Sequence, residues 1–440
     1  MENRFLKIAA NICFCIENQK EKEECTIRLL SKGTNNNLLS IKQLVVINTI
    51  LRMLIGQYLA VQNVILQSAF SSILNTNNIF FHSIDLKALR SLLFYRFVHI
   101  FLGKTHFSFM QISILMPVFN AENYLTDCLD SILAQSINNW ELIAVNDFST
   151  DQSGVILQAF AKKDNRIKVI HNQEKGIIPA LRLAFAKSTG QLITRMDADD
   201  KMHPQKLQLL QQKLLEHGPG HLATAYVTYF SAKSLGGGYQ RYEQWLNALT
   251  EGATNYADIY RECVIPSPCW MCYREDLEQC GAFEPDVYPE DYDLCFRFYK
   301  ENLKVLGVKQ QLHYWRDYPE RTSRNDEHYA DALYLHLKLH WFLQLDYHQD
   351  QPLFVWGAGK KGKAIAKHLS KEEVPFHWIC NQPSKWGHNI YGTVLQPISA
   401  LAEISNVQII IAVANPDDQK EIKQYLKADP FEDTKHWFFC

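Results

Sequence analysis

Met196-Asp197-Ala198-Asp199-Asp200 is the stretch that decides the fold of this 440-residue chain. It directly follows residues 191–196, a run with apolar Leu192, Ile193 and Met196 that predicts a buried strand. Three carboxylates at the mouth of such a strand repel one another, so they persist where a positive group neutralises them. Their hard oxygen atoms suit Mg²⁺ or Mn²⁺. The simpler alternative is a solvated turn whose last carboxylates cap the following helix.

Composition indicates a soluble globular protein that is long enough for two or three domains. The formal net charge is −2, which argues against a general nucleic-acid binder. The 11 cysteines lack the spacing of a disulfide framework, so reduced thiols in a cytoplasmic protein are expected. One C-x-x-C pair, Cys269 and Cys272, has no second well-spaced pair, which favours buried thiols over zinc.

Strand and helix patterns alternate in the residues before this stretch. Apolar runs predict strands at residues 112–116, 142–145, 167–170 and 191–196, and helical spacing predicts helices at residues 124–133, 155–160 and 179–187. The alternation predicts an α/β fold with a mainly parallel sheet and helices on both faces. Ligands of such sheets bind at the carboxyl ends of the strands. Asp147 and Asp197 both follow a strand, so one shared site is expected.

Four elements in the right order resemble the family 2 glycosyltransferases of the GT-A fold. They are residues 112–120, 145–151 and 197–200, and the later Pro289-Glu290-Asp291-Tyr292-Asp293-Leu294. The resemblance extends over roughly residues 111–324 and is specific for the fold and the reaction, and much less for the sugar.

The resemblance implies a nucleotide-sugar site and a metal. The residues expected to contact the nucleotide sugar are Pro117, Asn120, Glu122, Asp147 and Asp197, with Asp147 hydrogen-bonding the base. Asp197, Asp199 and Asp200 are expected to hold Mn²⁺ or Mg²⁺ against the diphosphate. The chain departs from the family at Asn146, where many relatives have aspartate, and at Phe148, where glycine is common. Phe148 is expected to reshape the base pocket, which leaves the donor nucleotide open.

Sugar transfer also requires a group that removes a proton from the acceptor hydroxyl. The resemblance implies that Asp291 is this base and that Glu290 supports it. The alternative from the sequence is that Glu290, Asp291 and Asp293 begin a helix, where the helix dipole favours acids. Both descriptions can hold together. The expected reaction is metal-dependent and inverting, from a nucleotide sugar, with a UDP-sugar favoured, to a cell-surface glycan or a lipid-linked acceptor.

Residues 351–440 are expected to form a small Rossmann-like domain, joined to the GT-A domain (residues 110–330) by a helix within residues 331–350. A strand at residues 353–356 precedes Gly357, Gly359 and Gly362, which are spaced as G-x-G-x-x-G in the context that gives this motif its meaning. These glycines mark a candidate second nucleotide site. Asn381 stands where a ribose-binding acid is expected, which argues against redox use.

Residues 1–109 differ from the rest because acids are scarce after Glu24. Two interpretations stay open: peripheral contact with an anionic inner membrane surface, or a poorly ordered or untranslated leader. Two rival functions also stay open for the whole chain. One is a sugar-nucleotide sensor without catalysis, and the other is a dinucleotide-dependent oxidoreductase.

Overall fold

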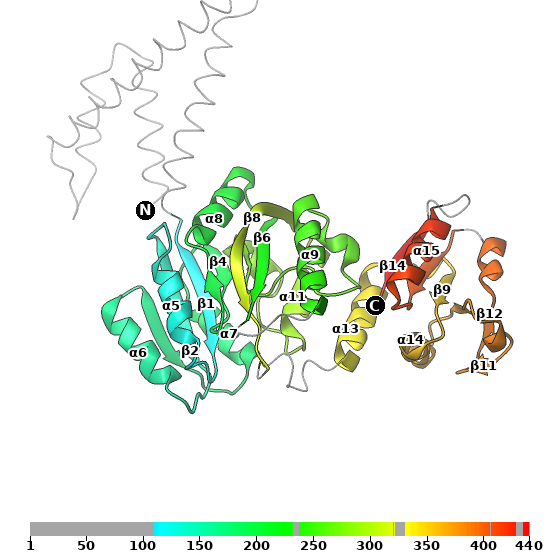
Figure 1. Cartoon of the computed structure of the whole chain (residues 1–440), viewed down its shortest axis with the longest axis horizontal. Helices are drawn as coiled ribbons and strands as arrows, with labels where there is room; N and C mark the ends of the chain where they lie inside the picture. The colour runs from blue at the N-terminus through cyan, green and yellow to red at the C-terminus, as the bar shows by residue number, and fades with distance from the viewer. Residues whose placement is uncertain are drawn as a thin grey trace, which may run out of the picture. The chain divides into compact units, whose positions relative to one another are not determined.

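The computed structural model describes residues 110–231, 237–319, 321, 331–404, 406–427 and 434–439 (Figure 1). The expectations for residues 1–109 lie outside these residues. No helix in this part of the chain is both long and apolar enough to cross a membrane.

An eight-stranded sheet carries the acidic stretch. Its strands run in the order β3-β2-β1-β4-β7-β6-β8-β5. The first four are parallel, as predicted from the sequence, whereas β7 and β5 pair antiparallel with their neighbours. The strands are β1 Ile112–Val118, β2 Trp140–Asn146, β3 Ile167–His171, β4 Leu192–Arg195, β5 Lys201–Met202, β6 His221–Phe230, β7 Trp270–Tyr273 and β8 Lys304–Arg316.

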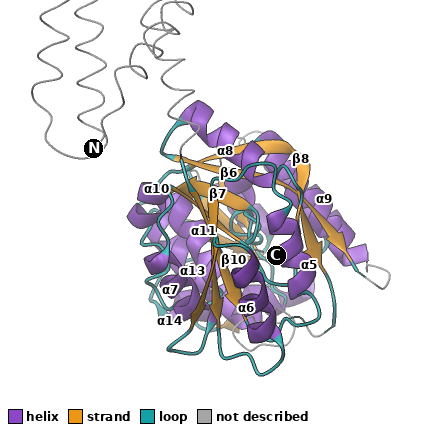
Figure 2. Ribbon diagram, turned by 90° about the vertical axis from the view of Figure 1, so that its left-hand side faces the viewer, coloured by secondary structure: helices purple, strands orange, loops and turns teal. Residues whose placement is uncertain are grey.

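Helices cover both faces of this sheet, which confirms the predicted layers (Figure 2). Side chains alternate along β1, so Ile114 and Met116 pack into the cluster with α5, whereas Leu115 packs into the cluster with α7. The helices are α5 Leu125–Leu133, α6 Ser153–Lys163, α7 Ile177–Lys187, α8 Lys206–His217, α9 Gly237–Gly252, α10 Arg274–Gln279, α11 Glu290–Lys300 and α13 Asp331–Leu345, with a short 3₁₀ turn at Asn255–Asp258.

The glycine run at residues 236–238 is typical of a flexible loop or a turn, but Gly237 and Gly238 begin helix α9. Asn120 is of a type that often caps a helix, but Tyr124 occupies the N-cap position of α5 and Asn120 is turned toward the loop after β2. The long pair of β6 and β8 was also missed, because β8 carries a mixture of polar and apolar residues instead of an apolar run.

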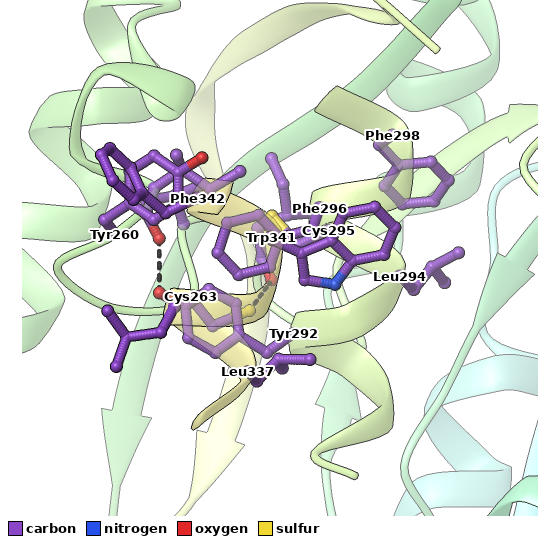
Figure 3. Close-up of a cluster of buried hydrophobic side chains, with 14 of the residues drawn as sticks. Tyr260, Cys263, Tyr292, Leu294, Cys295, Phe296, Phe298, Leu337, Trp341 and Phe342 are labelled. Atoms are coloured by element: carbon purple, nitrogen blue, oxygen red, sulfur yellow. Dashed lines mark hydrogen bonds between the residues drawn. The ribbon is translucent and has the colours of Figure 1, made fainter. Parts of the chain in front are cut away.

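Helix α11 is held rigidly between the sheet and α13 (Figure 3). Its aromatic side chains Tyr292 and Phe296 are fully buried, and Phe296 stacks on Trp341 of α13. Asp293 in the first turn accepts hydrogen bonds from the Trp341 indole at 3.0 Å and from Arg297 at 2.8 Å. The start of α11 is therefore fixed by buried contacts on two sides.

A second sheet of six strands lies in residues 353–438, in the order β11-β12-β10-β9-β13-β14. All its pairings are parallel except that of β11 with β12. The strands are β9 Leu353–Trp356, β10 His377–Ile379, β11 Asn389–Ile390, β12 Thr393–Gln396, β13 Gln408–Ile411 and β14 Lys435–Phe438, and the helices are α14 Lys360–Lys371 and α15 Pro416–Leu426.

Candidate functional site

The loops that leave β1 and β2 are joined by hydrogen bonds. The Asn120 side-chain oxygen accepts from the Thr150 amide at 2.8 Å, and a Glu122 carboxylate oxygen accepts from the Gln152 amide at 2.8 Å. Pro117 lies in β1 beside β2 and is partly exposed. Asn120 and Glu122 thus fix the shape of this edge, and both side chains are also exposed to solvent there.

Asp147 follows β2 and is buried at this edge. Its carboxylate accepts hydrogen bonds from the Asn172 side chain at 2.8 Å and from the Gly176 amide at 3.0 Å and 3.1 Å. Each carboxylate oxygen can accept about two hydrogen bonds, so capacity remains for a ligand donor. Asn172 was not predicted, because its role depends on a contact 25 residues away in the chain.

The acidic stretch follows β4, and its three carboxylates do different things. Asp197 and Asp199 are partly exposed, whereas Asp200 is fully buried. Both Asp200 oxygens accept hydrogen bonds within the protein, from His313 Nε2 at 2.9 Å and from the Arg316 amide at 2.7 Å. Asp200, which the sequence grouped with the metal ligands, therefore supports the other two from behind.

Burial raises the pKa of Asp199 to about 7, and the neighbouring Asp200 and Asp197 contribute to the rise. Burial likewise raises the pKa of Asp200 to about 7. A carboxyl whose pKa is raised in this way favours the binding of positive charge beside it, since that charge restores the ionised form.

A fully buried lysine and histidine stand behind the acidic stretch. Lys206 Nζ donates to the Pro268 carbonyl at 2.5 Å and lies 3.1 Å from His313 Nδ1. Because a lysine ammonium only donates, His313 Nδ1 accepts, and Nε2 carries the proton that reaches Asp200. Burial and the nearby Lys206 hold the pKa of His313 well below its ordinary value, so this imidazole is neutral.

Arg195, the last residue of β4, links the acidic stretch to the start of α11. Its Nε lies 3.1 Å from Asp197 Oδ1 and its Nη1 lies 3.0 Å from Glu290 Oε1. Arg195 and Glu290 are both nearly fully buried. Arg195 was not predicted, although a charged residue inside a run that predicts a buried strand is a signal that could have identified it.

Asp291 lies beside this ion pair and is partly exposed. It is in the first turn of α11, where three acids gather, so the expectation of a helix start also holds. Burial, with the adjacent Glu290, raises the pKa of Asp291 to about 7. A carboxyl that exchanges its proton near neutral pH is suited to general base catalysis.

Two arginines from the end of β8 and beyond surround the acidic stretch. Arg316 donates from Nε to the Asp199 carbonyl at 2.7 Å, and the Tyr318 hydroxyl donates to Asp199 Oδ2 at 2.9 Å. The charge of Arg321 lies close to Asp200 and Asp199, and these carboxylates raise the pKa of Arg321 above its ordinary value. The guanidinium of Arg321 is therefore a positive charge that the protein itself places beside the acidic stretch.

Within the described ranges, no group of three His, Cys, Asp or Glu side chains is arranged to enclose a metal ion. Mg²⁺ commonly takes one or two carboxylates and completes its shell with substrate phosphates and water. Asp197 and Asp199 fit that donor set. The cysteines of the C-x-x-C pair are buried free thiols.

The three glycines of the G-x-G-x-x-G spacing differ in their surroundings. A Cβ atom on Gly362 would lie 1.9 Å from the Gly357 carbonyl oxygen, and Gly357 itself has a φ of +123°. Gly359, in contrast, faces open space. The Asn381 side-chain oxygen accepts a hydrogen bond from the Trp356 indole at 2.8 Å, so part of the position expected for a ribose-binding acid is used by the fold.

Comparison with known proteins finds similarity to glycosyltransferases. The family model described as "Glycosyl transferase family 2" matches residues 113–281. The uncharacterized glycosyltransferase EpsJ of Bacillus subtilis is 35% identical over 267 residues, which cover 60% of this chain and 76% of EpsJ. The glycosyltransferase GlyA of Streptococcus pneumoniae is 26% identical over 211 residues, which cover 47% of this chain. The match spans only 30% of the length of GlyA.

Among solved structures, residues 1–349 of TarS from S. aureus, in complex with UDP-GlcNAc, align with a TM-score of 0.45 and 18% identity. The alignment covers 60% of this chain and 72% of the TarS chain.

Proposed function

Because the chain belongs to glycosyltransferase family 2 and has an α/β fold of the GT-A type, we propose that it transfers a sugar from a nucleotide sugar to an acceptor hydroxyl. The observation that carries the proposal is the ion pair network through Arg195. It joins the acidic stretch after β4 to the carboxyls that begin α11. A donor-binding group and a base are thereby held in one constellation.

Asp197 and Asp199 would hold Mn²⁺ or Mg²⁺, with Asp200 fixed behind them by His313 and the Arg316 amide. When bound, such an ion stabilises the negative charge that develops on the leaving diphosphate. The guanidinium of Arg321, close to these carboxylates, would contact the same phosphate oxygens.

Asp291 would take the proton of the acceptor hydroxyl as that oxygen attacks the sugar carbon from the side opposite the diphosphate. One displacement of this kind inverts the configuration at that carbon. Glu290 would keep Arg195 neutralised, which supports Asp291 without touching the acceptor. A base with a pKa near 7 matches this role at neutral pH.

The donor would bind with its base at Asp147 and with its diphosphate at the acidic stretch. We favour a UDP-sugar, because a buried carboxylate with remaining acceptor capacity suits the ring N–H of uracil. The acceptor would be a cell-surface glycan or a lipid-linked sugar. The engaged side-chain oxygen of Asn381 gives no support to a dinucleotide-dependent oxidoreductase in residues 351–440.

The test is a thermal-shift screen of nucleotide sugars with and without Mn²⁺, followed by transfer assays with the donor that binds. We expect Asp199→Ala to abolish metal-dependent donor binding. Tyr318→Phe is the matched control, because it removes only the hydroxyl that donates to Asp199 and should leave the metal dependence in place.

Undiminished donor turnover by Asp199→Ala would overturn the metal assignment. Donor binding by the intact protein with neither hydrolysis nor transfer would instead favour the sensor.

A further inference from the structure

Two aromatic side chains at the carboxyl ends of β1 and β2, where the donor is proposed to bind, are half exposed. Phe119 follows β1 and is 45% exposed, and Phe148 follows β2 and is 50% exposed. The Lys175 ammonium lies over the Phe119 ring, 5.0 Å from its centre. Among the described residues, no aromatic ring or cation lies against Phe148. Its ring is therefore open to a ligand.

The backbone at Phe148 shows that folding alone does not favour this residue. Its φ is +56°, in the left-handed region that a bulky side chain seldom adopts and that glycine or asparagine adopts at lower cost. Burial of the ring would offset that cost, but half of the side chain is in solvent. Strain and exposure do not assign a role by themselves, but Phe148 also directly follows the buried Asp147 at the carboxyl end of β2, where ligands of such sheets bind.

Hydrogen bonds hold the loops that carry Phe119 and Phe148 in a conformation that leaves both rings exposed. Besides the bonds of Asn120 and Glu122, the Ala121 amide donates to Ser153 Oγ at 2.9 Å and the Asn120 amide donates to Ser149 Oγ at 3.1 Å. Asp147, directly before Phe148, supplies a buried hydrogen-bond acceptor at the same edge. A ligand for this edge should therefore be flat, aromatic and able to donate a ring N–H.

A nucleobase has these properties. We infer that the Phe148 ring stacks on the base of the nucleotide donor while Asp147 accepts the N–H of that base, so that Phe148 determines the affinity for the nucleotide. The inference rests on the proposed function, since it concerns the same donor. It adds a contact that the acidic stretch does not provide, and this contact acts on binding instead of on the chemical step.

Tyr391 provides a matched control in the second sheet. Its φ is also +56°, and its side chain is 48% exposed, in the turn between β11 and β12. Replacement of either residue by glycine relieves the same backbone strain and removes an aromatic ring of similar exposure. Only Phe148→Gly should affect the donor.

The experiment measures the Kd for UDP by calorimetry and the melting temperature on the full chain, for the wild type, Phe148→Gly, Phe148→Tyr and Tyr391→Gly. Stacking of one base on an aromatic side chain corresponds to roughly fivefold to a hundredfold in affinity. We expect Phe148→Gly to raise the Kd by about tenfold with an unchanged or higher melting temperature. Phe148→Tyr should retain the wild-type Kd, and Tyr391→Gly should alter neither the Kd nor the KM.

Binding of UDP by the wild type, with a Phe148→Gly Kd within twofold of it, overturns the role of Phe148 and leaves the proposed function intact. A wild type that binds neither UDP nor any other nucleoside diphosphate overturns the proposed function, and the inference with it. A loss of affinity in Phe148→Gly that is accompanied by a lower melting temperature also counts against the inference, because it would indicate a structural role.

Discussion

The two sheets share a topology but differ in what stands at their carboxyl ends. In chain order, β3-β2-β1-β4 and β12-β10-β9-β13 both run 3-2-1-4, with parallel pairing throughout. In sheets of this order, ligands bind where the order reverses, which is beyond the carboxyl ends of β1 and β4 in the first sheet and of β9 and β13 in the second.

Charge separates the two edges. The first has Asp197, Asp199 and Asp200 after β4, with Arg195 and Lys206 buried behind them. The described loops of the second present glycines after β9 and Asn381 after β10, and the buried groups there are mainly apolar. Buried charges destabilise a fold unless they are paired, so their concentration at one edge supports our proposal that the chemistry takes place there. A shared topology provides the crevice and leaves its use undetermined.

The contrast between the two sheets depends most on the assignment of Asp291 as the base. Asp291→Asn keeps the shape of the side chain and removes the proton acceptor, so transfer should fall by about 10²–10⁴-fold with an unchanged donor Kd. Initial rates and donor titrations on the same protein would measure this. Asp286→Asn, on the surface of the preceding turn, is the control and should transfer normally. Normal transfer by Asp291→Asn together with failure of Glu290→Gln would exchange the two roles.

The pH dependence of transfer tests the assignment of Asp291 as the base in a second way. Burial and the neighbouring Glu290 raise the pKa of Asp291 to about 7, and the charge of Arg195 opposes this increase. Since the base must be ionised, the rate should rise about tenfold per pH unit below 7 and level off above it. The free energy of unfolding should change in the opposite direction and decrease as the pH rises. The folded form holds this proton more tightly than the unfolded form, so Asp291 contributes stability that is lost as pH rises from about 4 to 7.

A rate profile that is flat across neutral pH, or one that Asp291→Asn leaves unchanged, would show that another group takes the proton.

The smallest expected effect concerns the second sheet and affects stability alone. Gly362→Ala would place a Cβ atom 1.9 Å from the Gly357 carbonyl oxygen, so the backbone must shift at a cost of roughly 1–3 kcal/mol. Gly359→Ala is the matched control, because no atom lies within 4 Å of the added group. Thermal unfolding should separate the two variants, and both should retain the wild-type transfer rate at low temperature. A lower rate in both variants would indicate that the second sheet takes part in the reaction.

Local patterns predicted the parallel half of the first sheet and part of the second sheet. Strand β9 was predicted with the bounds that the structure shows, because four apolar residues between turn signals define it. The acidic stretch was identified from the strand before it, and the carboxyls of α11 were identified from the family resemblance. Each of the two segments is continuous in the chain.

The contacts that join these elements could not be predicted. Lys206 meets His313 across 107 residues, and Arg195 meets Glu290 across 95 residues. Such pairs depend on how the strands are ordered, and no local pattern fixes the order of β6, β7 and β8, in which β7 pairs antiparallel with β6 and β6 pairs in parallel with β8. The two arms of the site were therefore predicted, and the buried groups that hold them together were not.

The hydrogen bond from Trp341 to Asp293 limits where this chain can be divided. Asp293 is two residues from Asp291, and Trp341 lies in a helix that the sequence assigns to the connection between domains. A shortened chain that stops before α13 would lose the indole that holds the first turn of α11, along with the stacking of Trp341 on Phe296. For recombination with other transferases, the exchange point that preserves these contacts is after residue 345, so α13 should be inherited with the first sheet.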